Sequence, residues 1–216
     1  MKTSLKTELP LLLIVAVPFV YLALQWNQLP QEVPMHWNAR GEIDRWGSKS
    51  ELWLIPFLTT VLVYLIFLVV PAIDPKNKIE EMGVKYTQLK YIVTACMAAL
   101  AVVIIHMSGT SGEVSPAPLL AVIGLLFILL GNYFKTVRPN YFIGLRTPWT
   151  LESPEIWDKT HRLGGVVWFV GGLLMVIAAA FLSGQALISV FIGISAVVIT
   201  VPLVYSYLLY RKQKQT

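Results

Sequence analysis

Charged residues are scarce in this chain of 216 residues, because Asp, Glu, Lys and Arg make up only 13% of it, against about 25% in an average soluble domain. Apolar residues make up 56%. A chain with so little polar surface is a poor candidate for a water-soluble globule, and the sequence predicts a protein whose main solvent is lipid. The net charge of +5 then fits basic cytoplasmic loops, and we expect no direct contact with nucleic acid.

Cysteine and catalytic motifs are also scarce. The single cysteine, Cys96, lies in an apolar run, which excludes an intramolecular disulfide and any multi-cysteine zinc site. The sequence has no HExxH helix, no serine nucleophile elbow and no GxxxxGK[ST] phosphate loop. We therefore expect a non-enzymatic protein without catalytic residues, cofactor or metal ion. One alternative stays open, a metal-dependent hydrolase with His36 and Asp44, Glu32 or Glu113 on the outer face.

Six apolar runs are free of Asp, Glu, Lys and Arg and are long enough to approach or exceed the 17 to 25 helical residues that cross a bilayer. We therefore predict an all-α integral membrane protein with six transmembrane helices. The runs are Leu9 to Trp26, Leu52 to Ile73, Tyr91 to Met107, Leu119 to Phe134, Val166 to Leu182 and Ala186 to Tyr210.

The basic residues predict the orientation of these spans. With both termini in the cytoplasm, 14 of the 17 Lys and Arg residues fall on the cytoplasmic side, as the positive-inside rule requires. The other three, Arg40, Arg45 and Lys49, share one extracytoplasmic loop. We therefore expect a multi-pass protein of the cell membrane with cytoplasmic N- and C-termini.

Two units follow from the spacing of spans and loops. Residues 1–90 form an N-terminal two-span unit with the extracytoplasmic loop 27–51, and residues 91–216 form a four-span unit with the cytoplasmic loop 135–165.

The interior of the spans offers few functional candidates. His106 is the one ionisable side chain, near the outer end of its run, and an interfacial or helix-contacting role is favoured over a proton relay because no span holds a carboxylate. Pro18, Pro56 and Pro202 predict kinks, which serve either as hinges or as static packing features.

The extracytoplasmic loop has the composition of a shaped surface, since it combines prolines, glycines and two tryptophans with a few polar residues. Aromatic rings beside polar groups are typical binding anchors, and a plug that only anchors the flanking helices is the competing interpretation. The residues chosen for outer contact are His36, Trp37, Asn38, Gly41, Asp44 and Trp46.

The cytoplasmic loop contains a second pattern. Ser153, Pro154 and Glu155 suit the start of a helix, with serine as cap and proline in the first position. Lys159 and nearby arginines suit anionic lipid headgroups or an acidic partner, so lipid anchoring and partner docking both stay open. The candidate signalling residues are Gly144, Arg146, Thr147, Pro148, Trp149, Trp157, Thr160, His161 and Arg162.

These segments resemble a known family. FIGLRTPWTL followed by WDKTHRLGG, between Asn140 and Gly165, is similar to the signature of SdpI-family membrane proteins. VPMHWNARGEIDRWGSK, from Val33 to Lys49, resembles the N-terminal domain of unknown function that often accompanies it. The resemblance implies a bacterial immunity protein that protects the cell from a secreted killing peptide. In the best-developed form of that role, the toxin-bound protein also holds a cytoplasmic transcriptional repressor at the membrane.

The leading hypothesis is therefore an immunity and signal transduction protein, with a secreted peptide toxin, a cytoplasmic repressor and membrane lipids as partners. The alternative is a transporter for a peptide or small molecule. Against transport stand the lack of intramembrane acids for ion coupling and the lack of an inverted repeat.

Overall fold

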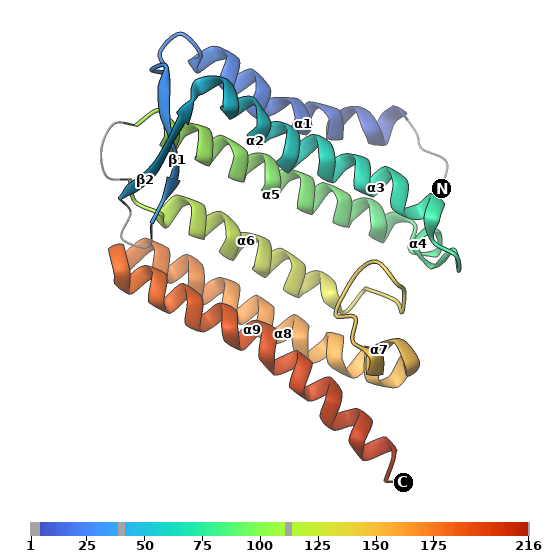
Figure 1. The fold of residues 1–216 in the computed structure, drawn as a ribbon. Helices are drawn as coiled ribbons and strands as arrows, with labels where there is room; N and C mark the ends of the chain where they lie inside the picture. The colour runs from blue at the N-terminus through green and yellow to red at the C-terminus, as the bar shows by residue number, and fades with distance from the viewer. Residues whose placement is uncertain (1–4, 39–41, 111–113, 216) are drawn as a thin grey trace.

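The computed structural model of the chain describes residues 5–38, 42–110 and 114–215. Long helices dominate it, with a small hairpin at one end (Figure 1). The long helices are α1 (Leu5–Gln25), α5 (Val84–Ser108), α6 (Ala117–Phe134), α8 (Pro154–Phe181) and α9 (Gly184–Gln213), together with a composite helix over Lys49–Ile73. The short helices α4 (Lys78–Glu81) and α7 (Pro148–Glu152) lie in connecting segments.

Six helices of the described residues are long and apolar enough to cross a membrane, which confirms the predicted number of spans. Several helices extend beyond the apolar runs. The third span begins at Val84 instead of Tyr91, and the fifth begins at Pro154 instead of Val166. Polar residues therefore belong to the ends of the spanning helices, because a backbone already in helical conformation continues into the interface without losing hydrogen bonds.

The long helices run side by side in two neighbouring groups (Figure 1). The Lys49–Ile73 helix and α1 pack around α5, whereas α8 packs closely against both α6 and α9. α5 also contacts α6 and so joins the two groups. The division of the chain at residues 90 and 91 stays a prediction.

The second spanning helix changes its winding at Pro56. It consists of a 3-10 turn η1 (Lys49–Trp53), the α-helical turn α2 (Leu54–Pro56), a π-helical turn η2 (Phe57–Val61) and α3 (Leu62–Ile73). Proline lacks the backbone N–H that an α-helix needs. The Thr60 hydroxyl donates to the Pro56 carbonyl at 2.7 Å and lies 3.3 Å from the Val15 carbonyl of α1. The predicted irregularity at Pro56 is thus a local rewinding that contacts the first helix.

Glycines set the close packing of α6 on α8. A Cβ atom added to Gly131 would lie 2.4 Å from the backbone nitrogen of Phe169, and one on Gly172 would lie 2.5 Å from the Gly124 carbonyl oxygen. Only hydrogen fits at such distances, so the two backbones touch directly. Gly165 makes the same kind of contact, with its virtual Cβ 2.8 Å from the Gly131 carbonyl oxygen.

The segment between α1 and the second spanning helix corrects the prediction of an all-α chain. It folds into an antiparallel hairpin of β1 (Glu32–Trp37) and β2 (Ile43–Ser48). Backbone groups that the loop would otherwise leave to water pair with each other in this ladder. The sequence hid the hairpin because its apolar and polar residues do not alternate strictly and Pro34 lies within β1.

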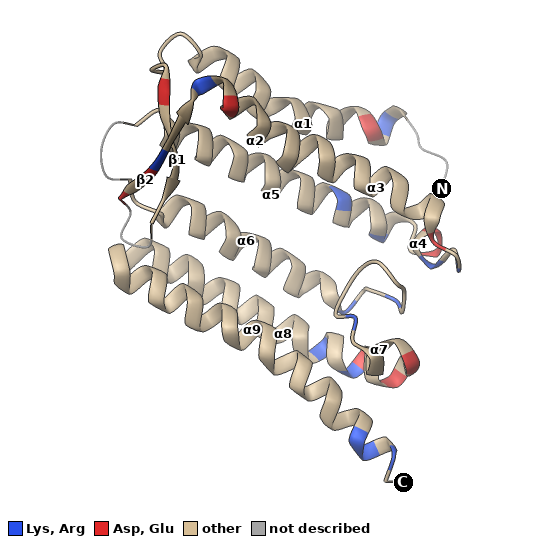
Figure 2. Cartoon of the chain, in the orientation of Figure 1, with Lys and Arg blue, Asp and Glu red and all other residues tan. Residues whose placement is uncertain are grey.

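Charged residues gather at the two ends of the helices and leave the middle of the bundle uncharged (Figure 2). The end with the N- and C-termini also carries α4, α7 and the segment between α6 and α8, and the opposite end carries the hairpin (Figure 1). This segregation is what a bilayer between the two ends requires.

Candidate functional site

The hairpin is fixed to the helix ends through β1. Val33 is fully buried and packs in one cluster with Leu22 of α1, Leu52 and Ile105 of α5. By contrast, β2 has no buried residue, and the Trp46 side chain is 55% exposed. One strand therefore holds the hairpin to the bundle, and the other presents its side chains outward.

Polar pairs organise the exposed part of the hairpin. His36 Nδ1 lies 2.5 Å from Asp44 Oδ1 across the two strands, with both side chains largely exposed. Near the turn, the Asn38 side-chain amide donates to Glu42 at 2.7 Å, and the Glu42 backbone N–H donates back to Asn38 Oδ1 at 3.1 Å. His36, Asn38 and Asp44 therefore do lie in one small region, as predicted from the sequence, while Gly41 lies outside the described residues.

The base of the hairpin is tied to the second span. Glu51 accepts from the Ser48 backbone N–H at 3.0 Å and lies 3.3 Å from the Arg45 guanidinium. The same serine caps the helix at its start, so one capping box sets the direction in which the chain passes from β2 into the second spanning helix. The partly buried Trp37 has an indole N–H without a hydrogen-bond partner in the described structure.

A metal centre on this face lacks support from the described residues. His36 and Asp44 approach each other, but no group of three His, Cys, Asp or Glu side chains lies close enough to hold an ion within residues 5–38, 42–110 and 114–215. Glu113 lies outside those residues.

The loop 135–165 is held in shape by Asn140, which is nearly fully buried. Its side-chain oxygen accepts from the backbone N–H groups of Phe142 and Ile143 at 2.8 and 2.7 Å. Its amide donates to the Arg138 and Ile143 carbonyl oxygens at 2.8 and 3.1 Å. One side chain thus replaces the backbone pairing that regular secondary structure would supply.

His161 of α8 attaches this loop to the bundle. Its Nε2 accepts from the Leu145 backbone N–H at 2.9 Å, so the proton is on Nδ1, which donates to the Trp157 carbonyl at 2.9 Å. The imidazole stacks on the Trp157 ring, with centroids 4.1 Å apart. Gly144 lies directly over it at a φ of +106°, and a Cβ there would come within 2.4 Å of Nε2. The glycine and the histidine therefore form one packed unit.

Trp157 fixes the other side of the same loop. Its ring is fully buried, and its indole N–H donates to the Val137 carbonyl at 2.8 Å. The predicted helix start is confirmed, because Ser153 caps α8 and accepts from the Ile156 backbone N–H. Thr160 is also fully buried, and its hydroxyl has no partner in the described structure.

The rest of the pattern contacts α9 or solvent. Thr147 caps α7 and its hydroxyl lies 3.3 Å from that of Ser206 on α9. Trp149 packs on Tyr207 of α9 with ring centroids 5.1 Å apart. Pro148, Arg146 and Arg162 are exposed. The residues predicted as one signalling set therefore divide into a buried group that positions the loop and an exposed group that a partner can reach.

The loop also borders an apolar cavity of about 550 Å³ between the two helix groups. Phe67 and Leu89 line it from one group, Trp168 from the other, and Ile143 from the loop. On the N-terminal side, Lys76 lies over the Tyr141 ring at 5.1 Å, and the hydrogen bond with the tyrosine raises the pKa of the lysine. Both features connect the loop to the N-terminal spans.

An ionic cluster inside the helix ends was missed by the sequence reasoning. Lys90 of α5 lies 2.6 Å from Glu8 of α1, with 3% and 14% of their side chains exposed. The Tyr64 hydroxyl of α3 donates to the same carboxylate at 2.7 Å. Both charges lie just outside the apolar runs, where sequence alone assigns them to loops. The signal that would reveal them is the pairing of opposite charges at the same end of two spans.

Two family models match the sequence in the regions described above. Residues 136–206 match the model of the SdpI/YfhL protein family, and residues 13–60 match a domain of unknown function, DUF1648. The C-terminal third of the chain is therefore similar to the SdpI/YfhL family. The first match covers the segment between α6 and α8, all of α8, and α9 as far as residue 206. The second covers α1 from residue 13, the hairpin, and the second spanning helix as far as residue 60.

Two relatives show how far the likeness extends. The chain is 22% identical to "Immunity protein SdpI" of Bacillus subtilis (strain 168) over 96% of its own length and 98% of the relative. It is 36% identical to an uncharacterized protein of Archaeoglobus fulgidus over 58 residues, 27% of this chain and 32% of the relative. No solved structure matches the chain. The likeness to the Bacillus protein spans both predicted units.

Proposed function

We propose that this protein protects a bacterial cell from a secreted killing peptide, and that both termini lie in the cytoplasm. The observation that carries the proposal is the full-length likeness to an immunity protein. The distribution of Lys and Arg supports the orientation, because the end with both termini holds most of them. The proposed role needs binding and no catalysis.

The outer hairpin is the proposed capture surface. An apolar peptide that approaches the membrane would meet Trp46 first, because this ring is the most exposed tryptophan in the described structure. The His36 and Asp44 pair beside it supplies hydrogen-bonding groups. A large exposed ring with polar neighbours is the usual composition of a binding anchor.

The cytoplasmic loop is the proposed signalling surface. Arg146, Pro148 and Arg162 are exposed and would contact an acidic surface of a transcriptional repressor. Trp157 and His161 are buried and would act by holding the loop in its conformation. A toxin could change this surface only by binding one arrangement of the helices better than another. The cavity between the helix groups and the Lys76 contact with Tyr141 offer a route for that coupling.

Survival of toxin-challenged cells tests the proposal. Cells would express the wild type, Trp46→Ala, His36→Ala or the control Trp149→Ala at equal membrane abundance. They would then be exposed to any killing peptide encoded beside the gene, or to the killing peptide of a related bacterium. We expect protection by the wild type and Trp149→Ala, and at least tenfold lower survival with Trp46→Ala, as loss of a hot spot of about 2 kcal/mol predicts.

Two outcomes would contradict the proposal. If the wild type protects no better than an empty vector against any such peptide, the immunity role fails. If Trp46→Ala and His36→Ala protect as well as the wild type, immunity stands but the hairpin is not its capture surface.

A further inference from the structure

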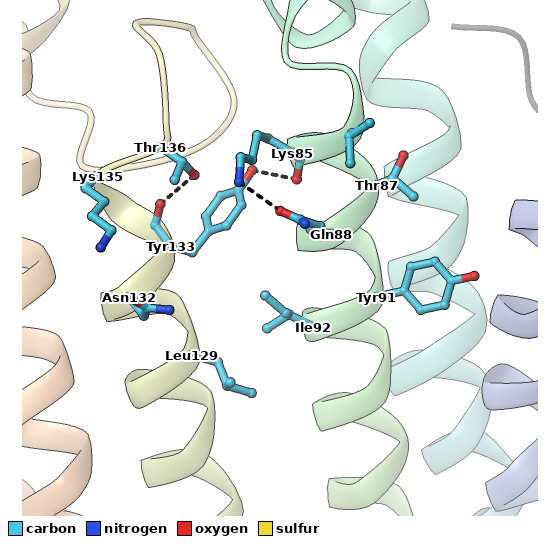
Figure 3. Close-up of a pocket in the computed structure, with 11 residues that line it drawn as sticks. Lys85, Thr87, Gln88, Tyr91, Ile92, Leu129, Asn132, Tyr133, Lys135 and Thr136 are labelled. Carbon is cyan, nitrogen blue, oxygen red and sulfur yellow. Dashed lines mark hydrogen bonds between the residues drawn. The ribbon is translucent and has the colours of Figure 1, made fainter.

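A pocket of about 570 Å³ lies between α5 and α6 at the end of the bundle that holds the termini (Figure 3). Tyr133 of α6 contacts α5 there, and its hydroxyl donates a hydrogen bond to the Lys85 carbonyl at 2.8 Å. Tyr133 borders this pocket and the apolar cavity behind the cytoplasmic loop. The pocket therefore lies next to that cavity, and its lining includes the first residues of the loop 135–165 but none of the exposed residues Arg146, Pro148 and Arg162.

The lining of the pocket changes from polar to apolar along the helices. At the terminal end it presents Lys85 and Gln88 from α5, Asn132 from α6, and Lys135, the C-cap residue of α6. Ile92 lies seven residues after Lys85, which is about 10 Å along a helix axis. Leu129 lies deeper than Lys135 by a similar distance on α6. Positive charge and amides thus lie at interface depth, and branched aliphatic chains lie at hydrocarbon depth.

The charge of the pocket is one-sided. Its lining includes two lysines and no Asp or Glu. In the part of the chain that the structure describes, neither lysine forms an ion pair, and Lys85 only reaches the Gln88 side-chain oxygen at 3.3 Å. Lys90, one helical turn and a half further along α5, is already neutralised by Glu8. Two unneutralised ammonium groups beside an apolar floor favour an amphipathic anion.

We infer that this pocket binds an anionic phospholipid of the cytoplasmic leaflet. The phosphate lies between Lys85 and Lys135, Asn132 and Gln88 supply neutral hydrogen bonds to the headgroup, and an acyl chain descends along Ile92 and Leu129. Basic pockets between spanning helices on the cytoplasmic side are the expected sites for such lipids. The inference uses the proposed orientation and does not depend on the immunity role.

Lipid retention measures this site directly. The full chain would be reconstituted in nanodiscs of phosphatidylglycerol and phosphatidylcholine in equal amounts, released into mild detergent, and examined by native mass spectrometry. We expect the wild type to retain phosphatidylglycerol in preference to phosphatidylcholine. Lys85→Gln with Lys135→Gln should lower the retained anionic lipid by about tenfold or more, because each lysine contributes on the order of 1 kcal/mol at the membrane surface.

Two control variants separate the site from general charge effects. Lys159→Gln with Lys214→Gln removes the same charge from the same end of the molecule but outside the pocket, and should retain lipid as the wild type does. Leu129→Trp keeps both lysines and fills the apolar floor, and should lower retention by blocking the acyl chain. Size-exclusion profiles of all variants verify that each is folded.

Three outcomes would overturn the inference. Equal retention of the two lipids by the wild type would show only annular contact, and an equal loss in both charge-removal variants would show a diffuse surface effect. Displacement of the bound lipid by millimolar inorganic phosphate, together with normal retention in Leu129→Trp, would assign the lysines to a soluble anion. None of these results bears on cell survival, so failure here is distinguishable from failure of the proposed immunity function.

Discussion

Glu8 and Lys90 form an ion pair of 2.6 Å across 82 residues of sequence, and the Tyr64 hydroxyl donates a second hydrogen bond to the same carboxylate. Because both charges are nearly buried, removing one leaves the other without a partner. Lys90→Met should lower the free energy of unfolding by about 3 kcal/mol. The change in stability is measured by heating each variant in detergent and recording the loss of its monodisperse peak in size-exclusion chromatography.

The double variant Glu8→Gln with Lys90→Met is the control for this pair. It removes both charges, so it should be more stable than Lys90→Met alone. A double variant as unstable as the sum of its two single changes would mean that the two residues act independently.

The hydrogen bond from Leu145 to His161 should determine whether the loop 135–165 stays packed on the bundle. His161→Phe keeps a ring that stacks on Trp157 but leaves the Leu145 N–H without an acceptor. We expect a loss of about 2 kcal/mol and faster hydrogen exchange in residues 136–147. Arg162→Ala, the exposed neighbour, should leave exchange unchanged. If residues 136–147 exchange hydrogen at the same rate in His161→Phe and in the wild type, other contacts hold the loop on the bundle.

The close approach of α6 to α8 should tolerate no methyl group at Gly131. An alanine Cβ would lie 2.4 Å from the Phe169 nitrogen, so the helices must separate, at a cost of about 1 to 3 kcal/mol. The matched change Gly193→Ala in α9 has no atom within 4 Å of its Cβ and should be neutral or stabilising. Thermal unfolding of the two variants tests this, and equal melting temperatures would contradict the packing account.

The proposed orientation predicts which positions an impermeant thiol reagent reaches in intact cells. In a Cys96→Ala background, Ser50→Cys should react without permeabilisation, whereas Gln215→Cys should react only after it. Both native residues are exposed in the structure, so burial does not distinguish them. Labelling of Gln215→Cys in intact cells would reverse the orientation.

The spans could be predicted because their cause is local. Each backbone in hydrocarbon must satisfy its own hydrogen bonds, so a run of apolar residues such as Ala186 to Tyr210 specifies a helix by itself. The extent of the helices was harder to predict, because a polar residue such as Lys90 belongs to a spanning helix through an ion pair with Glu8 of another helix, which the local sequence does not reveal. The predicted contact role of His106 is confirmed by its 2.9 Å hydrogen bond with Tyr21.

The candidate sites were predictable as segments and not as surfaces. The pattern around His161 identified the right region, but several of its residues, including Thr160 and Trp157, are buried. Sequence gives no measure of exposure in a polar loop, since a buried polar side chain and a solvated one carry the same letter. The hairpin was missed because apolar and polar residues do not alternate along its strands in a way that reveals their register. The side-chain contact between His36 and Asp44 depends on that register.

The sequence by itself determined the membrane class, the number of spans and the likeness to the SdpI/YfhL family, since composition and contiguous motifs carry that information. Only the tertiary structure decided which helices touch, where Glu8 meets Lys90, and that Lys85 and Lys135 share one pocket. Those relationships join residues far apart in the chain, and they arise from packing that no local pattern encodes.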